Sequence, residues 1–281
     1  MYKVYSAIEE RYVNPLFEVF DGGDFILSSY RDIEEKLTQV QIFFPEKEKI
    51  AAAQKCLQDA LEIVGVHPQI EVGEIPDQDW KLAYRRHFKT EKIGRRIIVH
   101  PPWEPMPTDG IVLTLDPGMA FGTGKHETTR ACLEYIDELS DKIAAPATFL
   151  DMGCGSGILS IAAAKLGYSS VRGFDVDQEA VDASRENAAG NNVSVDYFKY
   201  GLGAKIKKDL GAADLVAANI LGPLLIRFVD EIVPCVKKHL IISGILTTLY
   251  PEVLAAYTAH GLKEISHKTI GEWTTGLLSK K

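Results

Sequence analysis

The stretch TFLDMGCGSGILSIAAAKLG, residues 148–167, decides the fold expected of this chain. Its first three residues read as the end of a buried strand, and residues 158–166 form an apolar helix that ends at Gly167. Between them lies a turn with glycines at positions 153, 155 and 157. Glycines let a backbone approach a ligand closely, and a helix N-terminus presents free N–H groups. This strand, turn and helix therefore predict a nucleotide-type cofactor site.

The spacing of the glycines narrows the class of cofactor. A dinucleotide fingerprint, G-x-G-x-x-G, would need a glycine at Ile158, so a dehydrogenase is disfavoured. The turn also carries an acid, Asp151, directly after the strand. A tight turn that binds no ligand is the structural alternative at this point.

Composition places the chain among ordinary globular proteins. It has 281 residues, 46% hydrophobic and 25% charged, enough for one large domain or two smaller ones. No apolar run approaches the ~20 residues of a membrane span, and the N-terminus begins no secretory signal. The four cysteines are far apart and form no C-x-x-C pair, which argues against a disulfide framework or a zinc site. We expect a cytoplasmic protein without a membrane partner.

Charge is distributed unevenly along the chain. The net charge of −8 excludes a general nucleic-acid binder, and residues 1–72 hold 13 acids against 7 Lys and Arg. Residues 81–96 reverse the balance, with seven Lys and Arg against Glu91 alone. An acidic N-terminal module favours a basic partner. The basic segment could touch RNA, but a solvated face is the favoured interpretation.

The first 72 residues predict a small separate domain. Strands are expected at 2–8, 25–29, 39–44 and 70–72, with helices at 14–20 and 50–64, the second ending at Gly65. The order β-α-β-β-α-β is typical of a ferredoxin-like α+β sandwich. Residues 73–108 then form a connector, with a helix from Asp79 and a strand at 97–99.

Residues 109–281 form the expected catalytic domain. Residues 111–116 open it and lead into the glycine-rich stretch LDPGMAFGTGKHETT (115–129), which precedes a helix with Cys132, Leu133, Ile136 and Leu139 on one face. His126 is a possible general base, but at a helix start a structural role is favoured. Further strands are expected at 171–175, 193–197, 214–219, 239–242, 263–268 and 273–278, with a helix at 250–260. Alternating strands and helices predict a mainly parallel sheet that ends in an antiparallel hairpin.

Two side chains at strand ends suit a cofactor and its chemistry. Asp175 ends the strand expected at 171–175, where a carboxylate can accept hydrogen bonds from both ribose hydroxyls of an adenosine-containing cofactor. Asp177 is expected to cap the next helix. Asn219 ends the strand expected at 214–219. The side-chain amide of Asn219 can accept a hydrogen bond from an amine and so orient the lone pair of the amine nitrogen. The alternative for Asn219 is a cap of the helix after Pro223.

These motifs resemble the class I S-adenosylmethionine-dependent methyltransferases, through DMGCGSG (151–157) and GFD (173–175). LDPGMAFGTGKHETT, ANIL (218–221), SGIL (243–246) and GEWTTGLL (271–278) resemble one branch, the methyltransferases of ribosomal protein L11 (PrmA). The resemblance covers residues 77–281 well, and residues 1–72 only in general layout.

The resemblance implies a Rossmann-like, seven-stranded domain that binds S-adenosylmethionine. The family's cofactor residues carry over onto Thr129, Gly153, Asp175 and Asn219; the turn itself adds Asp151 and Gly155 as cofactor-binding candidates. Asn219 is the candidate catalytic residue. No metal is expected, because a sulfonium methyl is already activated.

The resemblance implies multiple methylation of lysine side chains and the N-terminal amine of ribosomal protein L11, with the N-terminal module recognising the substrate. We expect a monomer. Two alternatives remain: a methyltransferase of another protein or small molecule, and a non-catalytic, cofactor-binding assembly factor that uses residues 81–96 on ribosomal RNA. A protein-glutamine methyltransferase is disfavoured, because ANIL stands where that branch carries Asn-Pro-Pro-Tyr.

Overall fold

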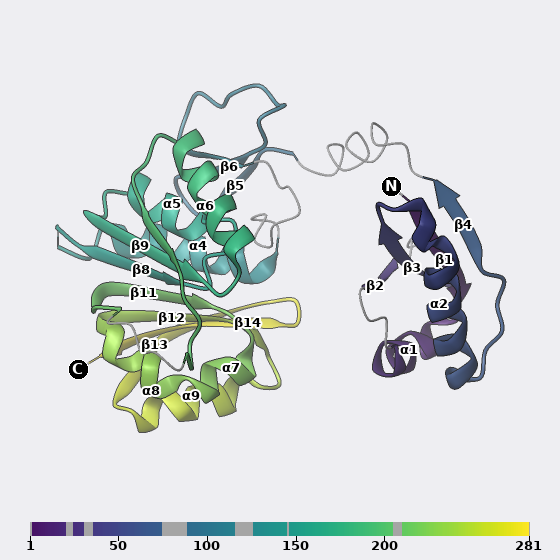
Figure 1. The fold of residues 1–281 in the computed structure, drawn as a ribbon. Helices are drawn as coiled ribbons and strands as arrows, with labels where there is room; N and C mark the ends of the chain where they lie inside the picture. Colours follow the sequence, from purple (N-terminus) through teal and green to yellow (C-terminus); the bar gives the residue numbers. More distant parts are fainter. Residues whose placement is uncertain are drawn as a thin grey trace. The chain divides into compact units, whose positions relative to one another are not determined.

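The computed structural model describes residues 2–20, 25–30, 36–74, 89–115, 126–144, 146–204 and 210–280 (Figure 1). Contacts divide the chain into two compact units, Met1–His87 and Phe88–Lys281. The helix expected from Asp79 lies outside the described residues. The domain boundaries of the sequence analysis stay predictions, although part of the expected connector belongs by its contacts to the second unit.

The first unit is a four-stranded antiparallel sheet in the order β2-β3-β1-β4. This order, on a β-α-β-β-α-β chain, confirms the ferredoxin-like prediction. Residues of β3 alternate between buried and half-buried, as in a strand with one face on a core, and α2 ends at Gly65 with φ +82°. The elements are β1 (Tyr2–Ile8), a 3-10 turn (Glu10–Tyr12), α1 (Val13–Val19), β2 (Leu27–Tyr30), β3 (Thr38–Phe44), a 3-10 turn (Lys47–Lys49), α2 (Ile50–Val64) and β4 (Glu71–Glu74).

The second unit is built on a seven-stranded sheet in the order β10-β9-β8-β11-β12-β14-β13. Pairings are parallel from β10 to β12, and β14 runs antiparallel to both neighbours, which confirms the predicted fold class. The central strand β11 is buried on both faces, as its continuous apolar run requires. The strands are β8 (Thr148–Met152), β9 (Ser170–Asp175), β10 (Asp196–Lys199), β11 (Ala213–Asn219), β12 (Val236–Leu246), β13 (Leu262–Ile270) and β14 (Trp273–Lys280).

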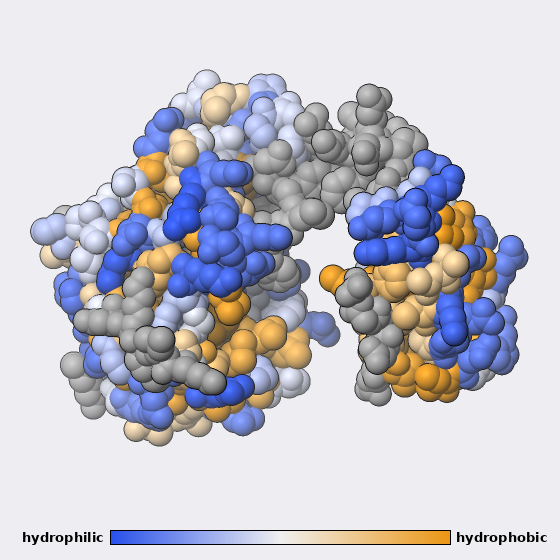
Figure 2. All heavy atoms as spheres, viewed as in Figure 1, coloured by the Kyte–Doolittle hydropathy of each residue, from blue (hydrophilic) through white to orange (hydrophobic). Residues whose placement is uncertain are grey.

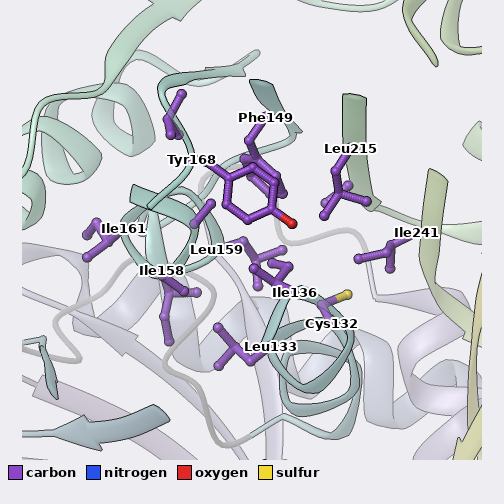
Figure 3. Packing of buried hydrophobic residues seen from close by; sticks show 14 of the residues in the cluster. Cys132, Leu133, Ile136, Phe149, Ile158, Leu159, Ile161, Tyr168, Leu215 and Ile241 are labelled. Atoms are coloured by element: carbon purple, nitrogen blue, oxygen red, sulfur yellow. The ribbon is translucent and has the colours of Figure 1, made fainter. Parts of the chain in front are cut away.

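Helices cover both faces of this sheet (Figure 1). Helices α4 to α6 enclose one core, where Phe149, Leu215 and Ile241 of the sheet meet Cys132, Leu133 and Ile136 of α4 (Figure 3). Helices α7 to α9 enclose a second core on the other face. The helical elements are α4 (Glu127–Ser140), α5 (Ile158–Lys165), α6 (Gln178–Gly190), α7 (Gly222–Arg227), α8 (Val229–Ile232), a 3-10 turn (Val233–Cys235) and α9 (Tyr250–Ala259).

The start of β10 differs from the sequence prediction. A strand was expected at 193–197, but β10 begins at Asp196. The backbone N–H of Val193 donates to the carbonyl of Ala188, and Asn192 has φ +56°. Residues before β10 therefore close α6, so they cannot join the sheet.

A further three-stranded sheet in the second unit joins the start of this unit to α4. It comprises β5 (Glu91–Ile93), β6 (Ile97–His100) and β7 (Ile111–Thr114), in that order. The turn between β5 and β6 is held by Asp137 of α4, whose carboxylate accepts hydrogen bonds from the backbone N–H groups of Arg95 (2.9 Å) and Arg96 (3.1 Å) and from Nε of Arg96 (2.7 Å). Burial alone would raise the pKa of Asp137, but these hydrogen bonds outweigh it and hold the pKa below its ordinary value.

The surface of each unit mixes hydrophilic and hydrophobic residues on the face displayed in Figure 2. Within the described ranges, no helix combines the length and the apolar character that a membrane span requires. Val176 and Leu221 of the second unit stay largely exposed, at 70% and 64%. Both border a pocket at the carboxyl ends of the parallel strands.

We predict that Asp137→Ala lowers the free energy of unfolding by about 2–3 kcal/mol, because it leaves two backbone N–H groups and Arg96 without their acceptor. Urea unfolding at pH 7 measures this loss. Asp141→Ala is the matched control: its carboxylate pairs with the same arginines but is 47% exposed, so its loss should stay below about 1 kcal/mol. Since the folded pKa of Asp137 is depressed, its contribution is present above ~pH 4 and should fade at lower pH. Equal losses for both variants would contradict the buried role.

Candidate functional site

A pocket of about 630 Å³ opens at the carboxyl ends of the parallel strands, a size that suits a small-molecule ligand. The turn after β8 contributes Gly153 and Gly155, β9 contributes Asp175, and β11 contributes Asn219. In open α/β sheets ligands bind at this edge, where the strand order reverses beside the first strand. The remaining lining residues include His126, Thr128, Tyr200, Leu224, Phe228 and Trp273.

The glycine turn has a backbone that other residues would not fit. Gly153, Gly155 and Gly157 have φ values of +74°, +52° and +80°, in the left-handed region. A Cβ on Gly153 would lie 2.6 Å from Cγ2 of Ile220, and one on Gly157 would lie 2.5 Å from the Tyr197 hydroxyl. The glycines therefore bring the turn against the end of β11 and leave its backbone open to the pocket.

Asp175 is fixed by two backbone hydrogen bonds. Its Oδ2 accepts from the N–H of Gly155 (2.9 Å), and its Oδ1 accepts from the N–H of Asp177 (3.1 Å). Each carboxylate oxygen keeps lone-pair capacity for a ligand hydroxyl. Asp177 caps α6 by accepting from the N–H of Glu179, as predicted.

The end of β11 is shaped by a glycine of the neighbouring strand. Gly244 of β12 has φ +79°, and a Cβ there would lie 2.4 Å from the carbonyl oxygen of Ile220. Asn219 lines the pocket, and no hydrogen bond links its side chain to another described residue. Leu221 takes the N-cap position of α7 without a side-chain cap, so Asn219 does not have the capping role considered as its alternative.

Asp151 lies behind the turn, fully buried, and is not among the lining residues. Its Oδ2 accepts from the N–H (3.2 Å) and hydroxyl (2.6 Å) of Ser160, while Oδ1 has no partner among the described residues. Burial raises the pKa of Asp151 to about 7, opposed by the Ser160 hydrogen bonds and aided by the charge of Asp175. A buried carboxylate with an unpartnered oxygen fits a ligand that brings a positive group to the turn.

The N-terminus of α4 forms another wall. His126 is its N-cap: Nδ1 accepts from the N–H of Thr128, and the ring lies edge-on to Trp273 with 5.0 Å between centroids. Thr128 lines the pocket, whereas the neighbouring Thr129 is 1% exposed and is not a lining residue. Helix capping is therefore the role that the geometry gives His126, in line with the structural role favoured from the sequence.

The family described as Ribosomal protein L11 methyltransferase (PrmA) matches residues 15–281 of this chain. The chain belongs to this family. Proteins named ribosomal protein L11 methyltransferase include one from Geobacter sulfurreducens, 43% identical over 74% of this chain and 68% of its own length. Another, from a Thermoanaerobacter species (strain X514), is 34% identical over 93% of this chain and 86% of its own.

A solved structure of a ribosomal protein L11 methylase from Lactobacillus delbrueckii subsp. bulgaricus supports the same assignment. It superposes with a TM-score of 0.61 at 30% identity, over 69% of this chain and 100% of that one. The chain is therefore a methyltransferase of this family.

The pocket unites four of the six predicted cofactor-binding residues: Gly153, Gly155, Asp175 and Asn219. Thr129 and Asp151 lie behind its wall, and their roles, like those of the other four, stay predictions. Sequence reasoning assigned no role in the site to Gly244 or Trp273. Their signal was present, since Gly244 lies in the motif SGIL near the end of β12, the neighbour of β11, and Trp273 lies in GEWTTGLL at the start of β14, the next strand after β12.

We predict that Gly244→Ala lowers kcat for methyl transfer about 10²-fold, because the added methyl group must displace the backbone of Ile220 and with it Asn219. Steady-state kinetics with S-adenosylmethionine as the methyl donor measures this. Gly261→Ala is the matched control: Gly261 has φ +83° but nothing within 4 Å of the added Cβ. It should share the backbone strain and keep kcat. Similar kcat values for both variants would contradict the close-approach argument.

Proposed function

We propose that this chain transfers methyl groups from S-adenosylmethionine to the lysine side chains and N-terminal amine of ribosomal protein L11. Family membership over residues 15–281 supports the reaction and its protein substrate. The observation that carries the proposal for the site is one pocket joining the glycine turn, Asp175 and Asn219.

The pocket residues divide between cofactor and acceptor. S-adenosylmethionine, when bound, supplies a methyl group already activated on a positively charged sulfur. Gly153 and Gly155 would admit its methionine end close to the turn, and Asp175 would accept hydrogen bonds from the ribose hydroxyls. Asn219 would accept a hydrogen bond from the acceptor amine and direct its lone pair toward the methyl group.

The acceptor amine must lose its proton before it can attack. A free lysine has a pKa of ~10.4, so the charged form dominates in water at neutral pH. Apolar lining residues such as Leu224 and Phe228 disfavour the charged form by desolvation. Proximity and orientation of the two bound reactants, to which Asn219 would contribute, would supply much of the rate, up to ~7–11 kcal/mol in well-aligned reactions.

The N-terminal unit suits a basic protein substrate. Residues 1–72 carry 13 acids against 7 Lys and Arg, so the unit attracts positive charge. This charge balance supports a role of the unit in substrate recognition.

The RNA-binding alternative is weakened by the described part of the basic segment. Arg95 and Arg96 form ion pairs with Asp137 and Asp141, so two positive charges of the basic segment are already paired with carboxylates of the same unit. Residues 81–88 lie outside the described ranges. Radiolabelled methyl transfer to ribosomal protein L11 tests the proposal, whereas steep, salt-dependent RNA binding without turnover would favour the assembly factor.

We predict that Asn219→Ala lowers methyl transfer far more than cofactor binding, because the amide acts on the acceptor amine. A loss of about 10²-fold in kcat is expected, with a change of a few-fold at most in the Kd of S-adenosylhomocysteine. Calorimetry and single-turnover kinetics give the two numbers. Equal losses in both would refute the role of Asn219.

We predict that Asp175→Ala weakens S-adenosylmethionine binding by about 10–100-fold, the size of two lost hydrogen bonds to a carboxylate. Calorimetric titration measures it. Asp182→Ala, a change of the same kind at an exposed position of α6, should bind as the unaltered protein does. Unchanged affinity in Asp175→Ala would remove the ribose contact from the proposal.

A further inference from the structure

Trp273 lies on the same face of the sheet as Asn219, at the same edge. Alternate residues of β11 and β14 point to the core beside α4, where Leu215, Ala217 and Leu277 are buried. Asn219 and Trp273 continue these two series, and both line the pocket. The two side chains therefore face one space from two strands, with β12 between them.

Hydrogen-bonded hydroxyl groups link the strands that carry the two residues. Ser243 of β12 is in register with Asn219, and its hydroxyl is 2.6 Å from that of Thr275 on β14. Ser243 also donates to the carbonyl of Thr128 at the start of α4. Trp273 is opposite Leu246, three residues beyond Ser243 on β12, so Asn219 and the indole face the pocket from two strands that are not neighbours.

We infer that Trp273, braced by His126, is a specificity-determining residue that binds the partly and fully methylated amine and so sets how many methyl groups are added. This inference rests on the proposed function. Asp175 is the one acidic side chain among the described residues that line the pocket, and it is the predicted ribose ligand. An aromatic face is then the group suited to a methylated ammonium, through cation–π attraction and apolar contact.

The chemistry of successive methylation explains the need for such a wall. In each cycle the nitrogen lone pair forms the new N–C bond as the methyl–sulfur bond breaks, and the bonding electrons remain on sulfur. After the first and second transfers the nitrogen must release a proton to water before it attacks again. Each transfer also removes one N–H group, so a tertiary amine has no hydrogen left to donate to Asn219. Its position then depends on packing, which the indole supplies.

His126 holds the indole in place. Its Nδ1 accepts from the N–H of Thr128 and lies 2.8 Å from that residue's hydroxyl, which fixes the imidazole plane. The edge-on contact with Trp273 at 5.0 Å then restricts the indole. His126 touches the indole and not the reacting atoms, so it acts as a positioning residue.

The test compares methylation steps in Trp273→Leu and Trp273→Phe, using the full chain and ribosomal protein L11 carrying unmodified or chemically dimethylated lysines. Single-turnover rates come from mass spectrometry. Trp273→Leu should slow the third transfer about tenfold more than the first and accumulate mono- and dimethylated product, whereas Trp273→Phe should retain trimethylation. His126→Ala should shift the distribution in the same direction as Trp273→Leu, but less.

Controls separate the inference from the proposed function. Trp103→Leu makes the same change outside the pocket and should leave the ratio of third to first transfer unchanged. Calorimetry with S-adenosylhomocysteine and thermal melting check that Trp273→Leu binds the cofactor and folds. If the unaltered chain methylates nothing, the proposed function fails. If it trimethylates and Trp273→Leu slows every transfer equally, or none, the inference is overturned while the function stands.

Discussion

The site depends on close contact between backbone segments around Ile220. Gly153 approaches its side chain from the turn after β8, and Gly244 approaches its carbonyl from β12. At each glycine an added Cβ would lie within 2.6 Å of a heavy atom of Ile220. Because neither glycine has a Cβ, the turn and β12 both pack closely against Ile220, and the cofactor turn and Asn219 line one pocket.

Hydrogen bonds extend this arrangement outward from the turn. Asp175 accepts from Gly155, so the acid of β9 and the glycine turn position each other. Ser243 links β12 to both Thr128 of α4 and Thr275 of β14. Asp137, at the other end of α4, holds the β5–β6 turn. Helix α4 thus connects the pocket wall to the start of the second unit, and a displacement of α4 would affect both.

The chemistry of the pocket follows from the small number of charges in it. Asp175 is its one acidic side chain among the described lining residues, and much of the remaining wall is apolar or aromatic. Such a wall favours the neutral amine as acceptor and tolerates a nitrogen that gains methyl groups and loses N–H donors. A site lined by carboxylates would instead stabilise the protonated amine, which cannot attack.

The amino-acid sequence by itself determined the local features: the glycine turn, the acid that ends β9, the Gly65 helix stop and the strand–helix alternation. These depend on backbone freedom and on hydrophobic period, which a few neighbouring residues set. Only the tertiary structure decided that Gly244 lies against Ile220, that Asn219 and Trp273 face one pocket, and that Asp137 holds a turn 42 residues away. Strand order and long-range packing bring these residues together, and the local sequence pattern does not specify which distant segments come into contact. The start of β10 was mispredicted because the N–H of Val193 donates to Ala188 of α6 and not to a neighbouring strand. The apolar pattern around Val193 does not distinguish these two partners.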